Sequence, residues 1–194
     1  WVDELKHSFE GMPFRDWAQM SKMLLSGLEG GGVPSVSEGK GLAAYFKGVD
    51  QTPLAAASIG QVHLATTYAG ERVVVKAIYP EIRRYLIADL KNARKAAQQI
   101  TWILKLPMKG TINAIMDEEV ECFPRELDLR IEARHLKKQR LYQKRHGLDI
   151  AIPVVVDELS SSSVLTQTFL TGTTMGNCNV DDPVVRQKAI DACK

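Results

Sequence analysis

The chain has 194 residues, with 25 Lys and Arg against 23 Asp and Glu and a formal net charge of +2. This length suits one domain with a hydrophobic core or one lobe of a larger protein, and the nearly balanced charge argues against a dedicated nucleic-acid binder. Three cysteines and four histidines without ligand spacing argue against a structural metal site and indicate a reducing compartment, and no apolar run approaches the ~20 residues of a membrane-spanning helix.

The beginning of the chain predicts a helix followed by a loop. Apolar residues recur at three- and four-residue steps, as on the buried face of a helix; they are Trp17, Met20, Met23, Leu24 and Leu28. The glycine-rich run 30–35 then ends the helix, so we assign residues 1–40 to an N-terminal helical extension and its loop. Since the chain starts on Trp1 without a basic apolar leader, we expect a piece of a longer protein whose targeting segment was removed or left out.

The next segment fits the nucleotide loop of protein kinases, with substitutions. The template G-x-G-x-x-G-x-V followed by V-A-I-K places Ala55, Ala57 and Gly60 at the three glycines and Lys76 at the lysine. Glycines let the backbone of such a loop close over the phosphates. Alanines therefore predict a stiffer loop that lies further from a nucleotide.

The hairpin around Lys76 is predicted independently of that template. Residues 61–67 and 72–78 are β-branched and apolar, and a turn containing Gly70 separates them. Lys76 would lie on the second strand of this hairpin. His63, inside the first strand, is more simply a packed residue than a base.

Two helices are predicted after the hairpin. Pro80 opens a segment with apolar residues at helical spacing up to Pro107. A second helix surrounds Glu126, in which one apolar stripe is bordered by Glu126 on one side and Asp128 on the other; its members are Val120, Phe123, Leu127 and Ile131. A carboxylate on that border can reach a lysine on a facing sheet, and geometry alone leaves Glu126 and Glu132 as alternative partners of Lys76.

The last elements are two strands, residues 152–157 and 164–170, joined by a tight loop at 160–163. Kinases take their catalytic aspartate and magnesium ligands from H-R-D-x-x-x-x-N and D-F-G motifs in the large lobe. Neither motif follows Leu170. Residues 41–172 are therefore predicted to form a small lobe, and residues 173–194 to begin the connection to a missing large lobe.

Four segments carry a resemblance to a known family. The run PLAAASIGQVH at 53–63, with VVVK at 73–76, resembles the UbiB-type atypical kinase-like family, also called the ABC-one family, which includes proteins supporting coenzyme Q synthesis. Residues 41–50 resemble the family's lead-in, 126–133 its E-x-D helix, and 163–172 its fifth strand and hinge. The resemblance implies an α+β, protein-kinase-like N-lobe: a twisted antiparallel sheet of about five strands with packed helices. The family's upstream K-x-G-Q helix has no match.

The resemblance also implies site residues. The nucleotide would be held by the alanine-rich loop, the strand lysine and the hinge, at Ala55, Ala56, Ala57, Ser58, Gly60, Lys76, Thr168 and Leu170. It favours Glu126 over Glu132 as the ion-pair partner of Lys76 and makes Asp128 a structural or gating carboxylate. Thr168 stands where the family usually has an acidic residue, which leaves the details of adenine recognition open.

The implied cofactor is ATP or ADP with Mg²⁺, the metal being bound mainly by residues outside this chain. The implied function is nucleotide binding and ATPase-type or small-molecule kinase activity linked to isoprenoid-quinone or other lipid metabolism. Mitochondria are the implied location, with plastids or the bacterial membrane periphery as alternatives. A second hypothesis is a catalytically dead, kinase-derived subunit of a larger assembly.

A basic run on the helix after Glu132 also has two interpretations; it comprises Arg134, Lys137, Lys138, Arg140, Lys144 and Arg145. The simpler one is a solvated helix face, and the other is a contact with a lipid or membrane surface or with a protein partner.

Overall fold

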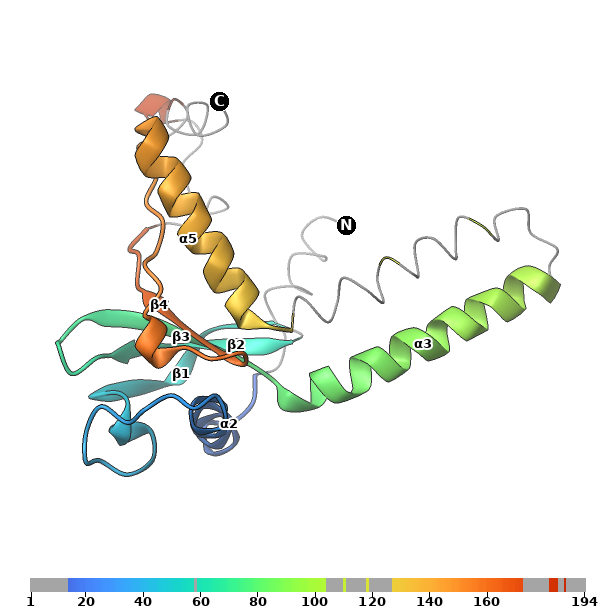
Figure 1. Cartoon of the computed structure of the whole chain (residues 1–194), viewed down its shortest axis with the longest axis horizontal. Coiled ribbons are helices and arrows are strands. Elements are labelled where there is room, and N and C mark those ends of the chain that lie inside the picture. Colours follow the sequence, from blue (N-terminus) through green and yellow to red (C-terminus); the bar gives the residue numbers. More distant parts are fainter. Residues whose placement is uncertain are drawn as a thin grey trace.

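The computed structural model describes residues 14–57, 59–103 and 127–172, together with 110, 118, 182–184 and 187. Its centre is an antiparallel sheet of four strands in the order β1-β2-β3-β4 (Figure 1). The strands are β1 (Gly48–Ala57), β2 (Gly60–Thr66), β3 (Arg72–Ile78) and β4 (Val164–Thr168). Antiparallel strands with segregated helices make this an α+β fold, which confirms the predicted class.

About five strands are predicted, and the described residues form four. Residues 152–157 run beside β4 but contribute only the isolated bridge between Val155 and Gln167. Pro153 has no N–H to give to a ladder, and the Val154 N–H bonds to the hydroxyl of Thr168 at 2.9 Å instead of to a backbone carbonyl. The segment therefore follows the edge of the sheet without joining it as a strand.

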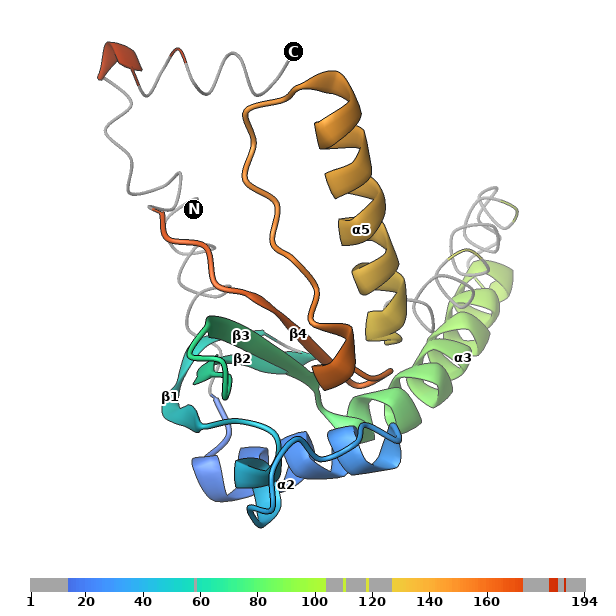
Figure 2. The same cartoon turned by 60° about the vertical axis from the view of Figure 1, so that its left-hand side comes forward.

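The two faces of the sheet are covered by different helices (Figure 2). Helix α2 (Trp17–Gly30) packs on one face, where Met20, Leu24 and Leu28 have no exposed surface. They share a core with alternate residues of the strands, namely Ala65, Val73, Val75, Ala77 and Val164. The predicted N-terminal helix is thus confirmed for its described residues, and it belongs to the same core as the sheet.

Close approach of α2 to β4 depends on a glycine. A Cβ atom at Gly27 would lie 2.6 Å from Val164 Cγ2, closer than carbon atoms pack. Just beside it, the Ser161 hydroxyl donates to the Gly27 carbonyl at 2.8 Å. Asp16 caps the other end of the helix by accepting from the Gln19 N–H at 2.8 Å. The contacts at Gly27 fix α2 against the loop that leads into β4.

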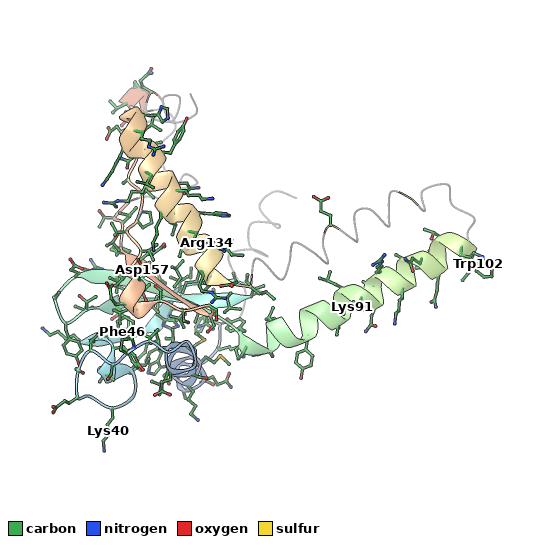
Figure 3. All side chains as sticks on the ribbon, viewed as in Figure 1. Lys40, Phe46, Lys91, Trp102, Arg134 and Asp157 are labelled. Atoms are coloured by element: carbon green, nitrogen blue, oxygen red, sulfur yellow. The ribbon has the colours of Figure 1, made fainter. Side chains whose placement is uncertain are left out.

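Helix α3 (Pro80–Ile103) starts where β3 ends and extends away from the sheet (Figure 1). The helix predicted from Pro80 is confirmed as far as Ile103, and residues 104–107 lie outside the described part. Its far end is exposed: the side chain of Trp102 is 75% accessible (Figure 3). In the described part of the chain, no helix is long and apolar enough to cross a membrane.

Helix α5 (Leu129–His146) stands on the opposite face from α2. Leu129 and Ala133 pack with Ile78 and Leu165 in a second, smaller apolar cluster. The helix begins later than the apolar stripe predicts, because Asp128 has extended backbone angles and acts as the N-cap. Gly147, at a φ of 62°, ends it in the left-handed conformation. Two short 3₁₀ helices, η1 (Gly41–Ala44) and η2 (Asp157–Leu159), complete the described elements.

Candidate functional site

Lys76 lies in a row that crosses all four strands. Ala55 pairs with Val62, Val62 with Lys76, and Lys76 with Leu165. Directly paired residues project to the same side of a sheet, so these four side chains share the face opposite α2. We call this side the Lys76 face. It is only partly covered, since Ala55 is exposed and Val62 is half-buried.

An ion pair joins this face to α5. Lys76 Nζ lies 2.6 Å from Glu132 Oε2, and the two side chains are 32% and 40% exposed. At that exposure an ion pair contributes under about 1 kcal/mol to stability. The main effect of this pair is therefore to position the ammonium group of Lys76 over the sheet. The paired residue is Glu132, the second of the two predicted alternatives. Glu126, the favoured one, lies outside the described residues.

Asp128 sets the start of the helix that carries Glu132. Its carboxylate accepts from the Arg130 N–H at 3.0 Å and from the Arg130 guanidinium at 2.7 Å. These hydrogen bonds raise the pKa of Arg130 above its usual value. The structural role predicted for Asp128 agrees with this geometry, while a gating role stays a prediction.

The alanines of the motif lie in a strand. Ala55, Ala56 and Ala57 are the last residues of β1 and pair with Val62, Gln61 and Gly60. The three alanines thus belong to the predicted hairpin, in which an extended backbone needs no glycine, and their contacts with a nucleotide stay a prediction. Only residues 58 and 59 connect the strands, and Ser58 lies outside the described residues.

Gly60 is required because a side chain would not fit between β2 and β3 at this position. Its φ is not positive, but a Cβ atom there would lie 2.2 Å from the backbone oxygen of Ala77 on β3. The retained third glycine thus lets β2 approach the strand that carries Lys76.

The two predicted hinge residues lie where β4 leaves the sheet. Thr168 exchanges hydrogen bonds with Val154: its N–H donates to the Val154 carbonyl, and its hydroxyl accepts from the Val154 N–H, both at 2.9 Å. The next N–H, of Phe169, donates to the Arg72 carbonyl at 3.1 Å. Leu170 follows, 43% exposed. The Thr168 and Phe169 N–H groups are therefore engaged within the chain, which leaves Leu170 as the hinge donor to consider.

A buried polar network on the α2 face was not predicted as a unit. Gln61 Oε1 accepts from the Arg15 N–H at 2.6 Å and from the Tyr79 hydroxyl at 2.7 Å, and Gln61 has no exposed surface. His63 is equally buried, and its Nδ1 lies 2.9 Å from the Asp50 carbonyl oxygen. Burial lowers the pKa of His63 and raises that of Tyr79. The packed, non-catalytic role expected for His63 fits this setting.

The basic run on α5 is mostly solvated, and two of its members hold the following segment. Lys137 Nζ lies 2.5 Å from Asp157 Oδ1, and Arg140 donates to the Ile152 carbonyl at 3.2 Å. Arg134, labelled with Asp157 in Figure 3, lines a cavity of about 700 Å³ next to the Lys137–Asp157 pair. Part of the run therefore fixes residues 152–157 against the helix.

Comparison with known proteins identifies the family of this chain. A family model described as the ABC1 atypical kinase-like domain matches residues 33–191. The chain belongs to this family. The match covers the sheet, the Lys76–Glu132 pair and the predicted hinge, and it confirms the resemblance drawn from the motifs.

Three relatives show how wide the family is. The mitochondrial atypical kinase coq-8 of Caenorhabditis elegans is 34% identical over 152 residues, which are 76% of this chain and 20% of that protein. An uncharacterized protein of Mycobacterium tuberculosis is 33% identical over 137 residues, covering 70% of this chain and 28% of its own length. The chloroplastic protein ACTIVITY OF BC1 COMPLEX KINASE 7 of Arabidopsis thaliana is 30% identical over 141 residues, 72% of this chain and 20% of its own.

One solved structure has a similar fold. Rv3197 of Mycobacterium tuberculosis, determined in complex with erythromycin, superposes with a TM-score of 0.57 and 31% identity over 86% of this chain and 38% of that one. The chain thus spans well under half of the length of each protein compared here.

Proposed function

We propose that the Lys76 face binds ATP or ADP, as the small lobe of an atypical kinase or ATPase. The observation that carries the proposal is the Lys76–Glu132 ion pair of 2.6 Å on a partly open sheet face. A lysine held in this way presents its charge to the α- and β-phosphates of a nucleotide. The β1–β2 turn, between Ala57 and Gly60, lies at the end of the same face and would cover the phosphates.

The described residues alone do not fit a Mg²⁺ site. Glu132 reaches the Lys76 face from α5, and Lys76 already engages its carboxylate. No group of three or more acidic, histidine or cysteine side chains able to hold a metal occurs among the described residues. We therefore assign no step to the metal in this chain, and expect its ligands in the longer protein, as in kinases.

The wider process is inferred from the relatives. The family resemblance and the mitochondrial coq-8 relative support a role of the intact protein in isoprenoid-quinone or other lipid metabolism. The same relative favours mitochondria, although the Arabidopsis relative is chloroplastic and the mycobacterial one bacterial.

A second candidate is a catalytically dead subunit that serves as an interaction module. The observation in its favour is the apolar end of α3, where Ile100, Trp102 and Ile103 are each more than half exposed. Exposed aromatic and aliphatic side chains in one place mark contacts with other molecules.

A lysine substitution separates the two candidates. We expect Lys76→Met to weaken ATP binding by the full-length protein at least about tenfold, since the charged contact to phosphate is lost. Lys137→Met is the matched control, because Lys137 also forms an exposed ion pair from α5 but with Asp157 and not with Lys76 or Glu132. Calorimetric titration with ATP measures both. Equal ATP affinity in the wild type and Lys76→Met would refute the nucleotide site and leave the interaction module.

A further inference from the structure

The polar cavity beside α5 lies on the side of that helix away from Lys76. It has a volume of about 700 Å³ and is lined by α5, the end of α2, the start of η2 and the loop 160–162. At about 100° per residue, the cations that α5 contributes lie roughly 140–200° around the helix from Glu132; they are Arg130, Arg134 and Lys137. A cavity of this size is typical of small-molecule sites, which span about 300–1,000 Å³.

The three cations of the cavity differ in how they are paired. They follow one stripe of α5, four and then three residues apart. The outer two are neutralised, since Arg130 pairs with Asp128 at 2.7 Å and Lys137 with Asp157 at 2.5 Å. Arg134, between them, donates to the Arg130 carbonyl at 3.4 Å, and no carboxylate pairs with it among the described residues. The middle of this wall therefore carries an uncompensated guanidinium group.

The loop 160–162 forms another wall and is held in place from two sides. The Ser161 hydroxyl donates to the Gly27 carbonyl of α2 at 2.8 Å, and the Ser162 carbonyl accepts from the Leu129 N–H of α5 at 2.9 Å. The Ser162 side chain lines the cavity, and its hydroxyl makes no hydrogen bond within the part of the chain that the structure describes. This hydroxyl is available to a ligand.

The lining groups select a ligand by charge and polarity. A guanidinium group binds phosphate oxygens through charge-assisted hydrogen bonds. The carboxylates of Asp128 and Asp157 would repel a second phosphate, but they can accept hydrogen bonds from hydroxyl groups. Among the described residues that line the cavity, Ala133 is the one with an apolar side chain. A nucleotide base or a lipid tail would therefore find little to pack against.

We propose that this cavity binds the phosphate ester of a small polyol, such as an inositol phosphate. Arg134 binds the phosphate, and Ser162 donates to it from the neighbouring wall. The carboxylates of Asp128 and Asp157 accept from the hydroxyl groups of the polyol. The site does not depend on nucleotide binding at Lys76.

The test compares myo-inositol 1-phosphate with myo-inositol, which lacks only the phosphate. In calorimetric titrations of the full-length protein, we expect the wild type to bind the phosphate ester at least about tenfold more tightly than the parent polyol. Arg134→Gln should remove this preference. Ser162→Ala should weaken binding of the ester several-fold, because one hydrogen bond is lost.

Arg145→Gln is the matched control. It removes the same charge from the same helix, about 16 Å further along, at a residue outside the cavity lining. At physiological ionic strength, charges more than about 8 Å apart are largely screened, so this variant should bind the ester like the wild type. Equal losses in Arg134→Gln and Arg145→Gln would reveal a general attraction to the basic helix and overturn the proposal.

Thermal unfolding without ligand separates binding from a structural role. Arg134 is exposed, so the thermal midpoint of Arg134→Gln should match that of the wild type. A fall of several degrees would show that the guanidinium group serves the fold, which overturns its assignment to a ligand.

Two further probes test the ligand class. If the wild type binds myo-inositol 1-phosphate no better than myo-inositol, the phosphate site is refuted. If inorganic phosphate binds as tightly as the ester, recognition of the polyol is refuted. Glycerophosphoinositol, a phospholipid headgroup, distinguishes the source of the ligand: binding tighter than that of the monoester supports a lipid headgroup, and weaker binding supports a free ester.

Discussion

Replacing Gly60 by alanine tests whether space explains the third glycine of the motif. The new Cβ atom would lie 2.2 Å from the Ala77 oxygen, and because that atom belongs to the backbone of a paired strand it has little freedom to move away. Overpacking of this kind costs about 1–3 kcal/mol. Replacing glycine also removes freedom from the unfolded chain, which returns about 0.4–1 kcal/mol. The net loss in free energy of unfolding should therefore lie between about 0 and 2.6 kcal/mol.

Gly48 provides the control for this substitution. It also lies in a strand and lacks a positive φ, but a Cβ atom there would meet nothing within 4 Å. Gly48→Ala should leave the free energy of unfolding unchanged or raise it slightly. Urea unfolding of both variants measures the difference. Equal free energies of unfolding for the two variants would refute the steric explanation for the glycine at position 60.

Three other changes give distinct results. His63 has a pKa lowered by burial, so the unfolded chain binds more protons than the folded one below the ordinary value of 6.5; stability should be complete above pH 6.5 and fall as the pH drops below it. His63→Gln should flatten that part of a stability curve measured by urea unfolding, and an unchanged slope would contradict the assignment. Leu24→Ala, at a fully buried position of α2, should cost about 2–5 kcal/mol in the same assay, whereas a loss below about 1 kcal/mol would show that α2 packs loosely on the sheet. Ala57→Gly should loosen the β1–β2 turn and change the ratio of ATP to ADP affinity, measured by titration; an identical ratio in both proteins would argue against a role of the turn at the phosphates.

Periodic patterns predicted most of the architecture. The helix of Met20, Leu24 and Leu28 and the hairpin that carries Lys76 follow from the spacing of apolar residues, because each buries one continuous stripe or one alternate set. The long helix from Pro80 also follows from this spacing, although its far end is exposed. The predicted strand at 152–157 failed for a local reason. Its valines favour a strand, but Pro153 and the Thr168 hydroxyl take the place of ladder hydrogen bonds.

The site was harder to predict, since it depends on contacts between distant segments. Lys76 and Glu132 are 56 positions apart, and the choice between Glu126 and Glu132 depends on where α5 begins. Asp128 was available as a signal: aspartate is a strong N-cap residue, and a helix that starts after it places Glu132 in the first turn.

The most direct test of the central claim is a structure of the full-length protein with a non-hydrolysable ATP analogue. We expect phosphate oxygens on the Lys76 face, within hydrogen-bonding distance of Lys76 Nζ, about 3 Å. A nucleotide bound elsewhere, with the Lys76–Glu132 pair intact and no phosphate beside it, would contradict nucleotide binding at the Lys76 face.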